Sequence, residues 1–494
     1  MDLRPAPGPH HMIRIPRLVL AGLSGGSGKT IVSLGLAGAW ARKGLAVAPF
    51  KKGPDYIDAA WLGLAANRPA CNLDPFLMEP DAVRALFVER AKGLDLAVVE
   101  GNRGLFDGGD AKGSVATSQL ARTLDAPLVL VLDATKMTRT AAAVVLGCNS
   151  FEPGFKLAGV ICNRTAGDRH RSILRQTIEE YTGVPVLGML PKLRQNPISE
   201  RHMGLMSNWE QEGLEDILSG IARTVADHCD LDRLLDIARQ APDMAPATEA
   251  LWPPTLPGPK PRIGYVLDAA LWFYYQENLE ALRRAGAELT PVSLLATDPW
   301  PELHGLYLGG GFPETQARAL ADNIAVREHV RALALSGAPV YAECGGFMVL
   351  CEELHAGGSI YPMAGVFPLA TTLCDRPQGL GYAEAVVSAP NPFHPVGTTL
   401  RGHEFHYSRC IPRSSYTGHG DPPVMALRME RGAGMLHGMD GAVMGNTFAA
   451  YTHIHALGAP HWAVNFVRAA QAAREGAALS GLSRQGSALD PLGG

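Results

Sequence analysis

The sequence lacks the features of a membrane protein, a general polyanion binder and a zinc protein. No apolar run reaches the ~18 residues of a membrane-spanning helix, and no apolar segment near the N-terminus precedes a cleavage site. The 44 basic and 48 acidic residues leave a net charge of −4, which argues against general nucleic-acid binding. No two of the eight cysteines have Cys-x-x-Cys spacing, which argues against a zinc site.

These absences favour one broad class of protein. Scattered cysteines are typical of a reducing compartment with free thiols, so we expect a cytoplasmic protein. From the lack of long apolar runs and the small net charge we expect no membrane and no nucleic-acid partner. The chain has 494 residues, of which 47% are hydrophobic and 19% charged, enough for two to four folded domains. The sequence is compatible with a homo-oligomer and leaves the oligomeric state open.

The pattern along the chain predicts two α/β domains. Before residue 240, short apolar runs alternate with helical patterns, as in a parallel sheet covered on both faces. The predicted strands there are residues 17–23, 46–50, 94–100, 128–133, 157–162 and 184–190, with helical patterns at 30–43 and 138–147. The pattern restarts with predicted strands at 262–267, 306–308 and 340–342 and a helix that begins near Gly345.

Two segments separate or end these domains. Residues 241–262 contain seven prolines, which is typical of an extended linker, and the end of the chain is rich in Gly, Ala and Ser. We therefore predict a P-loop domain at 14–240, a linker at 241–261, a second domain at 262–470 and a flexible tail at 471–494. In such folds ligands bind at the carboxyl ends of the strands.

The first predicted strand leads into a glycine-rich segment, residues 22–30 (GLSGGSGKT), and then into a helix. This variant of a P-loop predicts an ATP site, because glycine N–H groups and a lysine converge on phosphate oxygens. A structural Gly/Ser turn is the alternative. The candidate ATP-binding residues are Gly26, Ser27, Gly28, Lys29 and Thr30, with Asn163 as a candidate contact to the base or else a turn residue.

Four carboxylates follow nearby predicted strands. Asp55 and Asp58 lie in KKGPDYID, and Glu100 and Asp107 lie in VVEGNRGLFDG. Such acids hold Mg²⁺ and position a second reactant beside a triphosphate, although helix caps and turn acids have the same pattern. We take Thr30, Asp55 and Glu100 as candidate Mg²⁺ ligands, and all four acids as candidates for substrate binding and acyl transfer.

The second domain contains a candidate thiol nucleophile. Cys344, in YAECGGFM, lies at a predicted strand-to-helix turn flanked by glycine, where a helix N-terminus lowers a thiol pKa. Gly310, Gly311 and Gly345 are candidates for an oxyanion hole. A thiolate requires a histidine base, and the residues alone leave five candidates open: His403, His406, His437, His453 and His455.

Seven motifs occur in order: GGSGKT, KKGPDYIDAAW, VEGNRGLFDG, YLGGGFPE, YAECGGFMVL, GHEFHYS and AAYTHIH. Residues from about 15 to 470 thereby resemble the cobyrinic acid a,c-diamide synthases of cobalamin biosynthesis. The resemblance implies a dethiobiotin-synthetase-like P-loop domain followed by a class I glutamine amidotransferase domain. It implies a ligase that uses ATP–Mg²⁺, L-glutamine and a corrinoid polycarboxylate, and that amidates the a- and c-acetates through acyl phosphates.

The resemblance also implies residue roles. Cys344 is the nucleophile and His453 the general base, but His455 stands where many relatives of this class carry an acid, so the third triad member is open. The four carboxylates match motifs for metal and corrinoid handling, and Arg201 and His202 match a stretch at the nucleotide side. Alternatives are a hydrogenobyrinate a,c-diamide synthase, with a metal-free substrate, and a P-loop switch ATPase with a degenerate amidase-like module.

Overall fold

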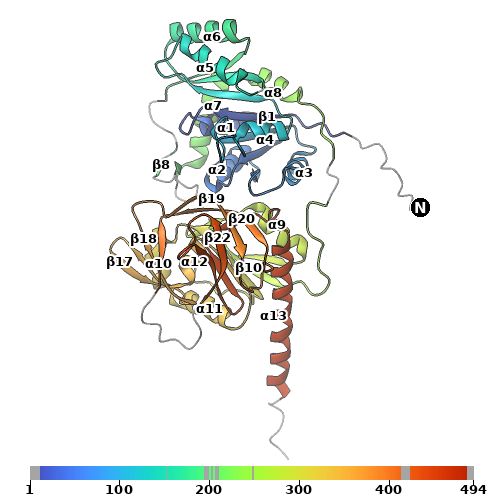
Figure 1. The fold of residues 1–494 in the computed structure, drawn as a ribbon, viewed down its shortest axis with the longest axis vertical. Coiled ribbons are helices and arrows are strands. Elements are labelled where there is room, and N and C mark those ends of the chain that lie inside the picture. The colour runs from blue at the N-terminus through green and yellow to red at the C-terminus, as the bar shows by residue number, and fades with distance from the viewer. Residues whose placement is uncertain are drawn as a thin grey trace, which may run out of the picture. The chain divides into compact units, whose positions relative to one another are not determined.

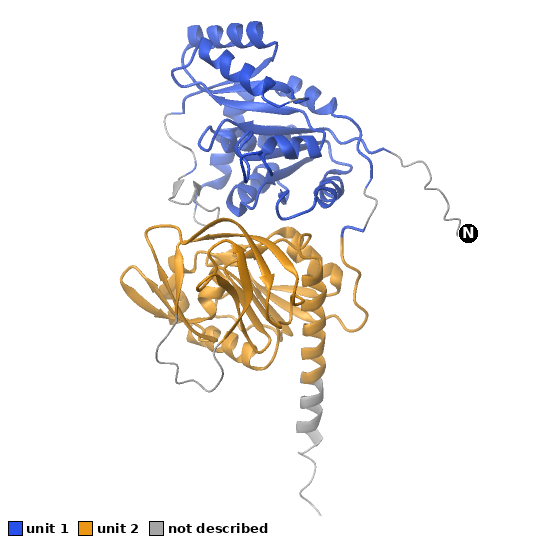
Figure 2. Ribbon diagram, viewed as in Figure 1, with its two compact units in different colours: residues 1–251 blue, residues 252–494 orange. Residues whose placement is uncertain are grey.

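The computed structural model describes residues 12–152, 154–193, 198, 200–201, 204–205, 211–246, 250–412 and 423–486. The chain divides into two compact units, residues 1–251 and 252–494, which Figure 2 shows in different colours. No helix in the described ranges is both long enough and apolar enough to cross a membrane.

The first unit is built on a parallel sheet whose strand order is β3-β2-β4-β1-β5-β6-β7. Its strands are β1 (Arg17–Gly22), β2 (Val47–Lys52), β3 (Cys71–Leu73), β4 (Leu96–Gly104), β5 (Leu128–Asp133), β6 (Leu157–Thr165) and β7 (Val186–Pro191). Every residue of β1 and β2 is buried, because helices cover both faces of the sheet. A small two-stranded sheet pairs β8 (Glu200–Arg201) with β9 (Gly204–Leu205).

Helices connect these strands, as Figure 1 shows. They are α1 (Lys29–Arg42), α2 (Tyr56–Ala66), α3 (Pro80–Ala91), α4 (Thr117–Thr123), α5 (Arg139–Ser150), α6 (Asp168–Thr182), α7 (Leu214–His228) and α8 (Leu231–Arg239). The phosphate-loop helix α1 packs against α2 and α7, and α5 packs against α6. The order β1–loop–α1 places the glycine-rich loop at the carboxyl edge of the sheet.

The second unit is built on a mixed sheet with the order β12-β10-β13-β15-β24-β23-β22-β19-β20-β25. Its strands are β10 (Arg262–Val266), β12 (Glu288–Val292), β13 (Gly305–Leu308), β15 (Val340–Glu343), β19 (Gly379–Val387), β20 (Thr399–His406), β22 (Val424–Arg431), β23 (Met439–Met444), β24 (Thr447–Ala450) and β25 (His453–Ile454). Strands β10, β12, β13, β15 and β24 pair in parallel, and the others pair antiparallel.

Smaller sheets and helices complete this unit. One sheet has the order β17-β16-β18-β21, and a second pairs β11 with β14. These strands are β11 (Leu271–Phe273), β14 (Gly310–Gly311), β16 (Cys351–Ala356), β17 (Ser359–Pro362), β18 (Phe367–Leu373) and β21 (Ser408–Pro412). The helices are α9 (Gln276–Ala285), η1 (Pro313–Gln316), α10 (Ala317–Asp322), α11 (Ile324–Leu335), α12 (Gly345–Leu350) and α13 (His461–Gly486).

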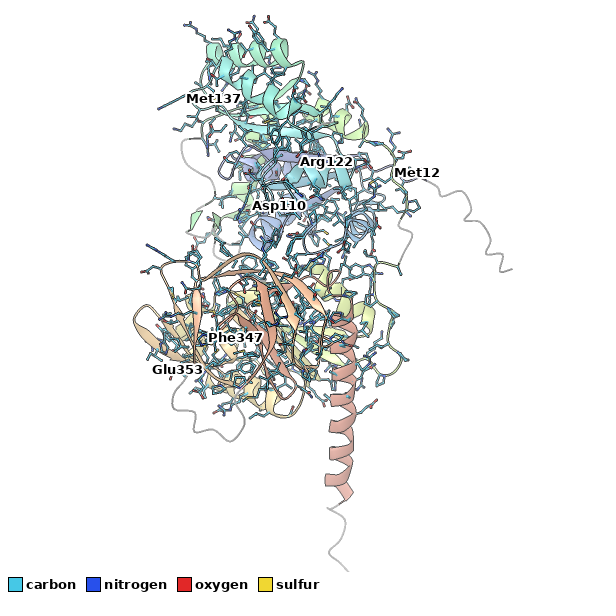
Figure 3. All side chains as sticks on the ribbon, in the orientation of Figure 1. Met12, Asp110, Arg122, Met137, Phe347 and Glu353 are labelled. Atoms are coloured by element: carbon cyan, nitrogen blue, oxygen red, sulfur yellow. The ribbon has the colours of Figure 1, made fainter. Side chains whose placement is uncertain are left out.

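The mixed sheet separates two hydrophobic cores. Along β15, Val340 and Ala342 point into one core and Tyr341 into the other, as the two-residue period of a strand requires. Phe347 of α12, labelled in Figure 3, is fully buried in the first core. The turn between β15 and α12 is therefore held rigidly by packing on both sides.

The fold confirms the predicted α/β class, with differences at element ends. Strand β4 does not end at Glu100 but continues to Gly104, because Gly104 pairs with Gly22 across a bulge. The three-residue strand β3 was not predicted, since so short a run has no clear period. All eight cysteines are free, as expected.

The predicted linker and tail also differ from the structure. Met244 pairs with Ile13, and Pro242 accepts a hydrogen bond from Arg17, so the start of the predicted linker belongs to the first unit. The tail predicted to be flexible from residue 471 instead continues helix α13 to Gly486. Alanine is the strongest helix former, and it recurs along this segment.

Candidate active sites

The glycine-rich loop joins β1 to α1, which begins at Lys29. Gly28 adopts a φ of 86°, and a Cβ there would lie 2.1 Å from Nδ2 of Asn163, so only glycine fits. No side chain caps α1, which leaves its first N–H groups available to an anion. The structure therefore brings the predicted ATP-binding residues together at a helix N-terminus.

Asn163 and Lys29 both brace this loop. Asn163 Nδ2 donates to the carbonyl of Ser27 at 3.0 Å, and Lys29 Nζ donates to the carbonyl of Ser24 at 2.9 Å. Burial lowers the pKa of Lys29, so its charge is poorly solvated and an incoming phosphate would compensate it. A contact between Asn163 and a nucleotide base stays a prediction.

Glu100 links the loop to the neighbouring strands. Its Oε1 accepts hydrogen bonds from the Thr30 hydroxyl at 2.7 Å and from Lys51 Nζ at 2.9 Å. Its Oε2 is buried and has no hydrogen-bond partner among the described residues. Burial raises the pKa of Glu100, although Lys51 opposes this rise. The carboxylate thus has one oxygen available for a ligand beside the phosphate loop.

Lys51 pairs with two acids at once. Its Nζ lies 2.6 Å from Asp58 Oδ2 and 2.9 Å from Glu100 Oε1, and its side chain is 2% exposed. Burial alone would lower the pKa of Lys51, but Asp58 and then Glu100 outweigh it and raise the pKa. The sequence predicts Lys51 as part of one local basic cluster, with Lys29 and Lys52, that meets the polyanionic ligands, but its pairing with these two acids was not predicted.

Asp55 and Asp58 lie together at the start of α2, as their spacing predicts. Asp55 is the N-cap residue, and its Oδ1 accepts a hydrogen bond from the Asp58 N–H at 2.9 Å. Burial, followed by the charge of Asp58, raises the pKa of Asp55 to about 7. A bound cation would relieve this unfavourable charge.

Asp107 lies on the exposed loop that follows β4. Its Oδ2 accepts a hydrogen bond from the Gly104 N–H at 3.0 Å, which closes the turn. The nearby Asp110, labelled in Figure 3, organises the same loop by accepting hydrogen bonds from Lys112 and Ser114. Arg201 belongs to β8, and His202 lies outside the described residues.

The thiol site lies where β15 turns into α12. Cys344 adopts a φ of 47° and a ψ of −99°, a strained conformation for a residue other than glycine. Its N–H donates to the carbonyl of Ala450 at 2.7 Å, so strand β24 holds the turn. The pKa of the Cys344 thiol is raised and not lowered as the helix N-terminus led us to expect, because burial, followed by the charge of Glu314, outweighs that effect. The thiol therefore needs a base to ionise it.

The three predicted oxyanion-hole glycines gather around this turn. A Cβ on Gly310 would lie 2.4 Å from His453 Cε1, and a Cβ on Gly345 would lie 2.9 Å from the Gly311 nitrogen. Residues with side chains would therefore displace the histidine or separate the two backbones. That the N–H groups of Gly310, Gly311 and Gly345 form an oxyanion hole stays a prediction.

Of the five candidate histidines, His453 adjoins both the glycines and an acid. Its Nδ1 lies 3.7 Å from Glu343 Oε2, and its ring stacks on His403 with centroids 4.8 Å apart. The others differ in setting: His455 lies 3.6 Å from Glu277, His406 stacks on Tyr451, and His437 is exposed.

Glu343, which lies immediately before Cys344, was not among the predicted site residues. The residue was visible in the motif YAECGG, but nothing in a linear pattern shows that it meets a histidine 110 positions later. The parallel pairing of β15 with β24, which aligns Glu343 with Ala450, creates this contact.

Comparison with known proteins assigns both units. Residues 18–204 match the family model described as the CobQ/CobB/MinD/ParA nucleotide binding domain, and residues 262–461 match the CobB/CobQ-like glutamine amidotransferase domain. A solved glutamine amidotransferase structure aligns with 42% of this chain and 98% of its own, at 19% identity and a TM-score of 0.31.

Full-length relatives agree with these matches. The cobyrinate a,c-diamide synthase of Magnetococcus marinus is 42% identical, over 91% of this chain and 96% of its own. The proteins of the same name from Archaeoglobus fulgidus and Listeria innocua are each 39% identical, over 92% and 89% of this chain and 98% and 96% of their own. The chain belongs to the cobyrinate a,c-diamide synthase family.

Proposed function

We propose that this protein is a glutamine-hydrolysing, ATP-dependent ligase that amidates the a- and c-acetate groups of cobyrinate. In the first unit, a substrate carboxylate oxygen attacks the γ-phosphorus of ATP and ADP leaves, which forms an acyl phosphate. Ammonia then attacks the acyl carbon, phosphate leaves, and an amide results. Excluding water from the acyl phosphate prevents its hydrolysis.

Within the first unit, the N-terminus of α1 and Lys29 bind the triphosphate. Lys51, held between Asp58 and Glu100, places a buried positive charge near the site of phosphoryl transfer. Asp55 and Asp58 face the same cluster and would position the substrate. Asp107, on the exposed loop after β4, would contact the corrinoid.

We propose that Mg²⁺ accompanies ATP. The described residues contain no ready-made group of three His, Cys, Asp or Glu side chains around a metal position. Mg²⁺ in nucleotide sites needs only one or two protein ligands besides phosphates, and the buried Glu100 Oε2 fits that need. Thr30, Glu100 and Asp55 would hold the ion, which would neutralise charge on the transferring phosphoryl group.

In the second unit, the Cys344 thiolate attacks the side-chain amide carbon of glutamine. His453 takes the thiol proton and passes it to the leaving nitrogen, which departs as ammonia. Water then hydrolyses the glutamyl thioester. The N–H groups near Gly310, Gly311 and Gly345 would stabilise the tetrahedral oxyanion.

The observation that carries this proposal is the junction at Glu100. One oxygen is committed to Thr30 and Lys51, and the other is buried without a hydrogen-bond partner beside a phosphate loop. A carboxylate so placed costs free energy unless a ligand compensates it.

The test is to incubate the purified protein with ATP, Mg²⁺, glutamine and cobyrinate, and to follow the product by mass spectrometry. We expect two successive conversions of carboxylate to amide, with one ADP formed for each. ATP hydrolysis without any change in the corrinoid would overturn the proposal and favour the switch-ATPase alternative.

Hydrogenobyrinate is the second candidate substrate. The relatives carry the name cobyrinate a,c-diamide synthase, which is why cobyrinate is named first. Parallel assays with the cobalt-bound and metal-free acids distinguish the two, and the larger kcat/KM identifies the substrate.

A further inference from the structure

We propose that Glu343 positions His453 for glutamine hydrolysis and is the third member of the Cys344–His453 system. The inference rests on the proposed glutaminase activity and goes beyond it by assigning the acid. This acid would come from the residue that precedes the nucleophile and not from the segment that follows the histidine, where His455 stands.

Glu343 faces the Nδ1 nitrogen of the His453 ring, which leaves Nε2 for proton transfer with the thiol. Its Oε2 lies 3.7 Å from His453 Nδ1, and both side chains are almost fully buried, at 1% and 2% exposure. A base acts through one ring nitrogen while a partner on the other fixes its tautomer. Catalytic hydrogen bonds in ligand-free structures are commonly longer than in the substrate complex.

Glu343 Oε2 accepts a hydrogen bond whose direction follows from its neighbours. Asn278 Oδ1 accepts from the Ala456 N–H at 2.7 Å, which orients the amide so that its Nδ2 donates to the Tyr307 hydroxyl at 3.2 Å. Tyr307 has only one proton of its own, and it donates this proton to Glu343 Oε2 at 2.9 Å.

The second oxygen of Glu343 is also an acceptor. Its Oε1 accepts a hydrogen bond from the Ile454 N–H at 3.1 Å, on the residue that follows His453. The Glu343 carboxylate therefore binds the backbone of β25, the strand that carries His453, and also faces the His453 ring. Both oxygens accept from donors, which is the pattern of an ionised carboxylate.

The other buried acids near this site bind other groups. Asp440 accepts hydrogen bonds from the N–H groups of Tyr451 and Thr452, at 3.0 Å each. Glu404 accepts from the N–H groups of residues 433 and 434, at 2.8 and 2.7 Å. Glu277 lies 3.6 Å from His455. Glu277 is therefore a matched control, a buried acid beside the neighbouring histidine.

The test compares Glu343→Gln with Glu277→Gln in the full-length protein. We expect Glu343→Gln to lower kcat for glutamine hydrolysis by on the order of 10²- to 10⁴-fold with little change in KM, because the tautomer and the imidazolium lose their partner. Glu277→Gln should stay within about threefold of the wild type. Thermal unfolding of each variant reports folding.

A second readout distinguishes positioning from a merely structural role. The rate of Cys344 alkylation by iodoacetamide against pH should shift to higher pH in Glu343→Gln, because the thiolate–imidazolium pair is weakened. The same curve should not move in Glu277→Gln. Other titratable groups face this pair or Glu343, and they are unchanged in both variants: Tyr307, Glu314, His403, Glu404, His406 and Tyr451.

Glu343→Asp covers the case in which Glu343→Gln does not fold. It keeps the negative charge but shortens the side chain by one methylene, which moves the carboxylate away from His453, so kcat should fall by about tenfold. Wild-type kcat together with an unshifted alkylation curve, in either folded variant, overturns the proposal.

Failure of the proposed function has a different outcome. If the wild-type protein does not hydrolyse glutamine, the function itself is wrong. If the wild type hydrolyses glutamine and the Glu343 variants match it, only the role of Glu343 is wrong. If Glu343 does position His453, ammonia-driven amidation should persist in Glu343→Gln, because only the ammonia source is lost.

Discussion

The hydroxyl of Thr30, in the first turn of α1, lies 2.7 Å from Oε1 of Glu100, in β4. This contact joins the phosphate loop to the neighbouring strand and orients the carboxylate so that its second oxygen remains without a hydrogen-bond partner. In the proposed function, ATP binding and acyl transfer depend on this buried acid, and the next two expectations test it.

Replacing Glu100 by Gln should remove the ligase reaction with either nitrogen source. The amide is a poor Mg²⁺ ligand and does not balance Lys51, so we expect amidation from both glutamine and free ammonia to fall by about 10²-fold or more. Initial rates with each source measure this, and Glu215→Gln, on the exposed face of α7, is the control. Full ammonia-dependent activity in Glu100→Gln would contradict the role.

Replacing Lys51 by Met should destabilise the first unit. It leaves the buried Glu100 and the partly exposed Asp58 without their cation, and breaking a buried pair costs about 3–5 kcal/mol. Urea unfolding measures the change, with the exposed Lys92→Met as the control. Combining Lys51→Met with Glu100→Gln should restore part of the lost free energy of unfolding. If the double variant is no more stable than Lys51→Met, Lys51 and Glu100 do not pair directly.

The sequence predicts the local parts of this site better than its long-range contacts. The loop and α1 follow from GGSGKT, because glycine freedom and helix capping are local properties. Lys51 was predicted only as a member of a basic cluster with Lys29 and Lys52. Its contact with Glu100 was not predicted, since it arises from the pairing of β2 with β4, which brings the two residues opposite each other. Such register depends on the whole sheet and not on a motif.

Asp55 should make stability depend on pH. Its pKa rises from 3.8 to about 7 on folding, mainly through burial, so the folded state binds the proton more tightly. Its stabilising contribution is therefore present below about pH 4 and is lost as the pH rises toward 7.

Asp55→Asn removes this titration while keeping the helix cap. Between pH 4 and 7 the urea midpoint of the wild type, without Mg²⁺, should fall relative to that of the variant. A difference that does not change with pH would show that Asp55 has an ordinary pKa.

Gly310→Ala should strongly reduce glutamine hydrolysis without removing ammonia-dependent amidation. The new Cβ would lie 2.4 Å from His453 Cε1, so the imidazole must leave its place. We expect kcat for glutamine hydrolysis to fall by on the order of 10²-fold. Gly476→Ala in α13 meets no atom within 4 Å and is the control; equal activity of the two variants would be the contrary result.

The second unit shows the same limit of prediction. The elbow at Cys344 follows from its flanking glycines, and five histidines were found as candidates. Choosing His453 by physical criteria needs β25 beside β20 and the contact with Glu343, both of which join segments far apart in the chain. The antiparallel strands of this sheet were likewise not predicted, because their apolar periods are short.

The most direct test of two separate chemistries in one chain is Cys344→Ser, assayed by mass spectrometry of the corrinoid. We expect that glutamine no longer supports amide formation, whereas ammonium salts with ATP and Mg²⁺ support it at close to the wild-type rate, because only the ammonia source is removed. Amidation from glutamine that survives in Cys344→Ser would show that Cys344 does not supply the ammonia.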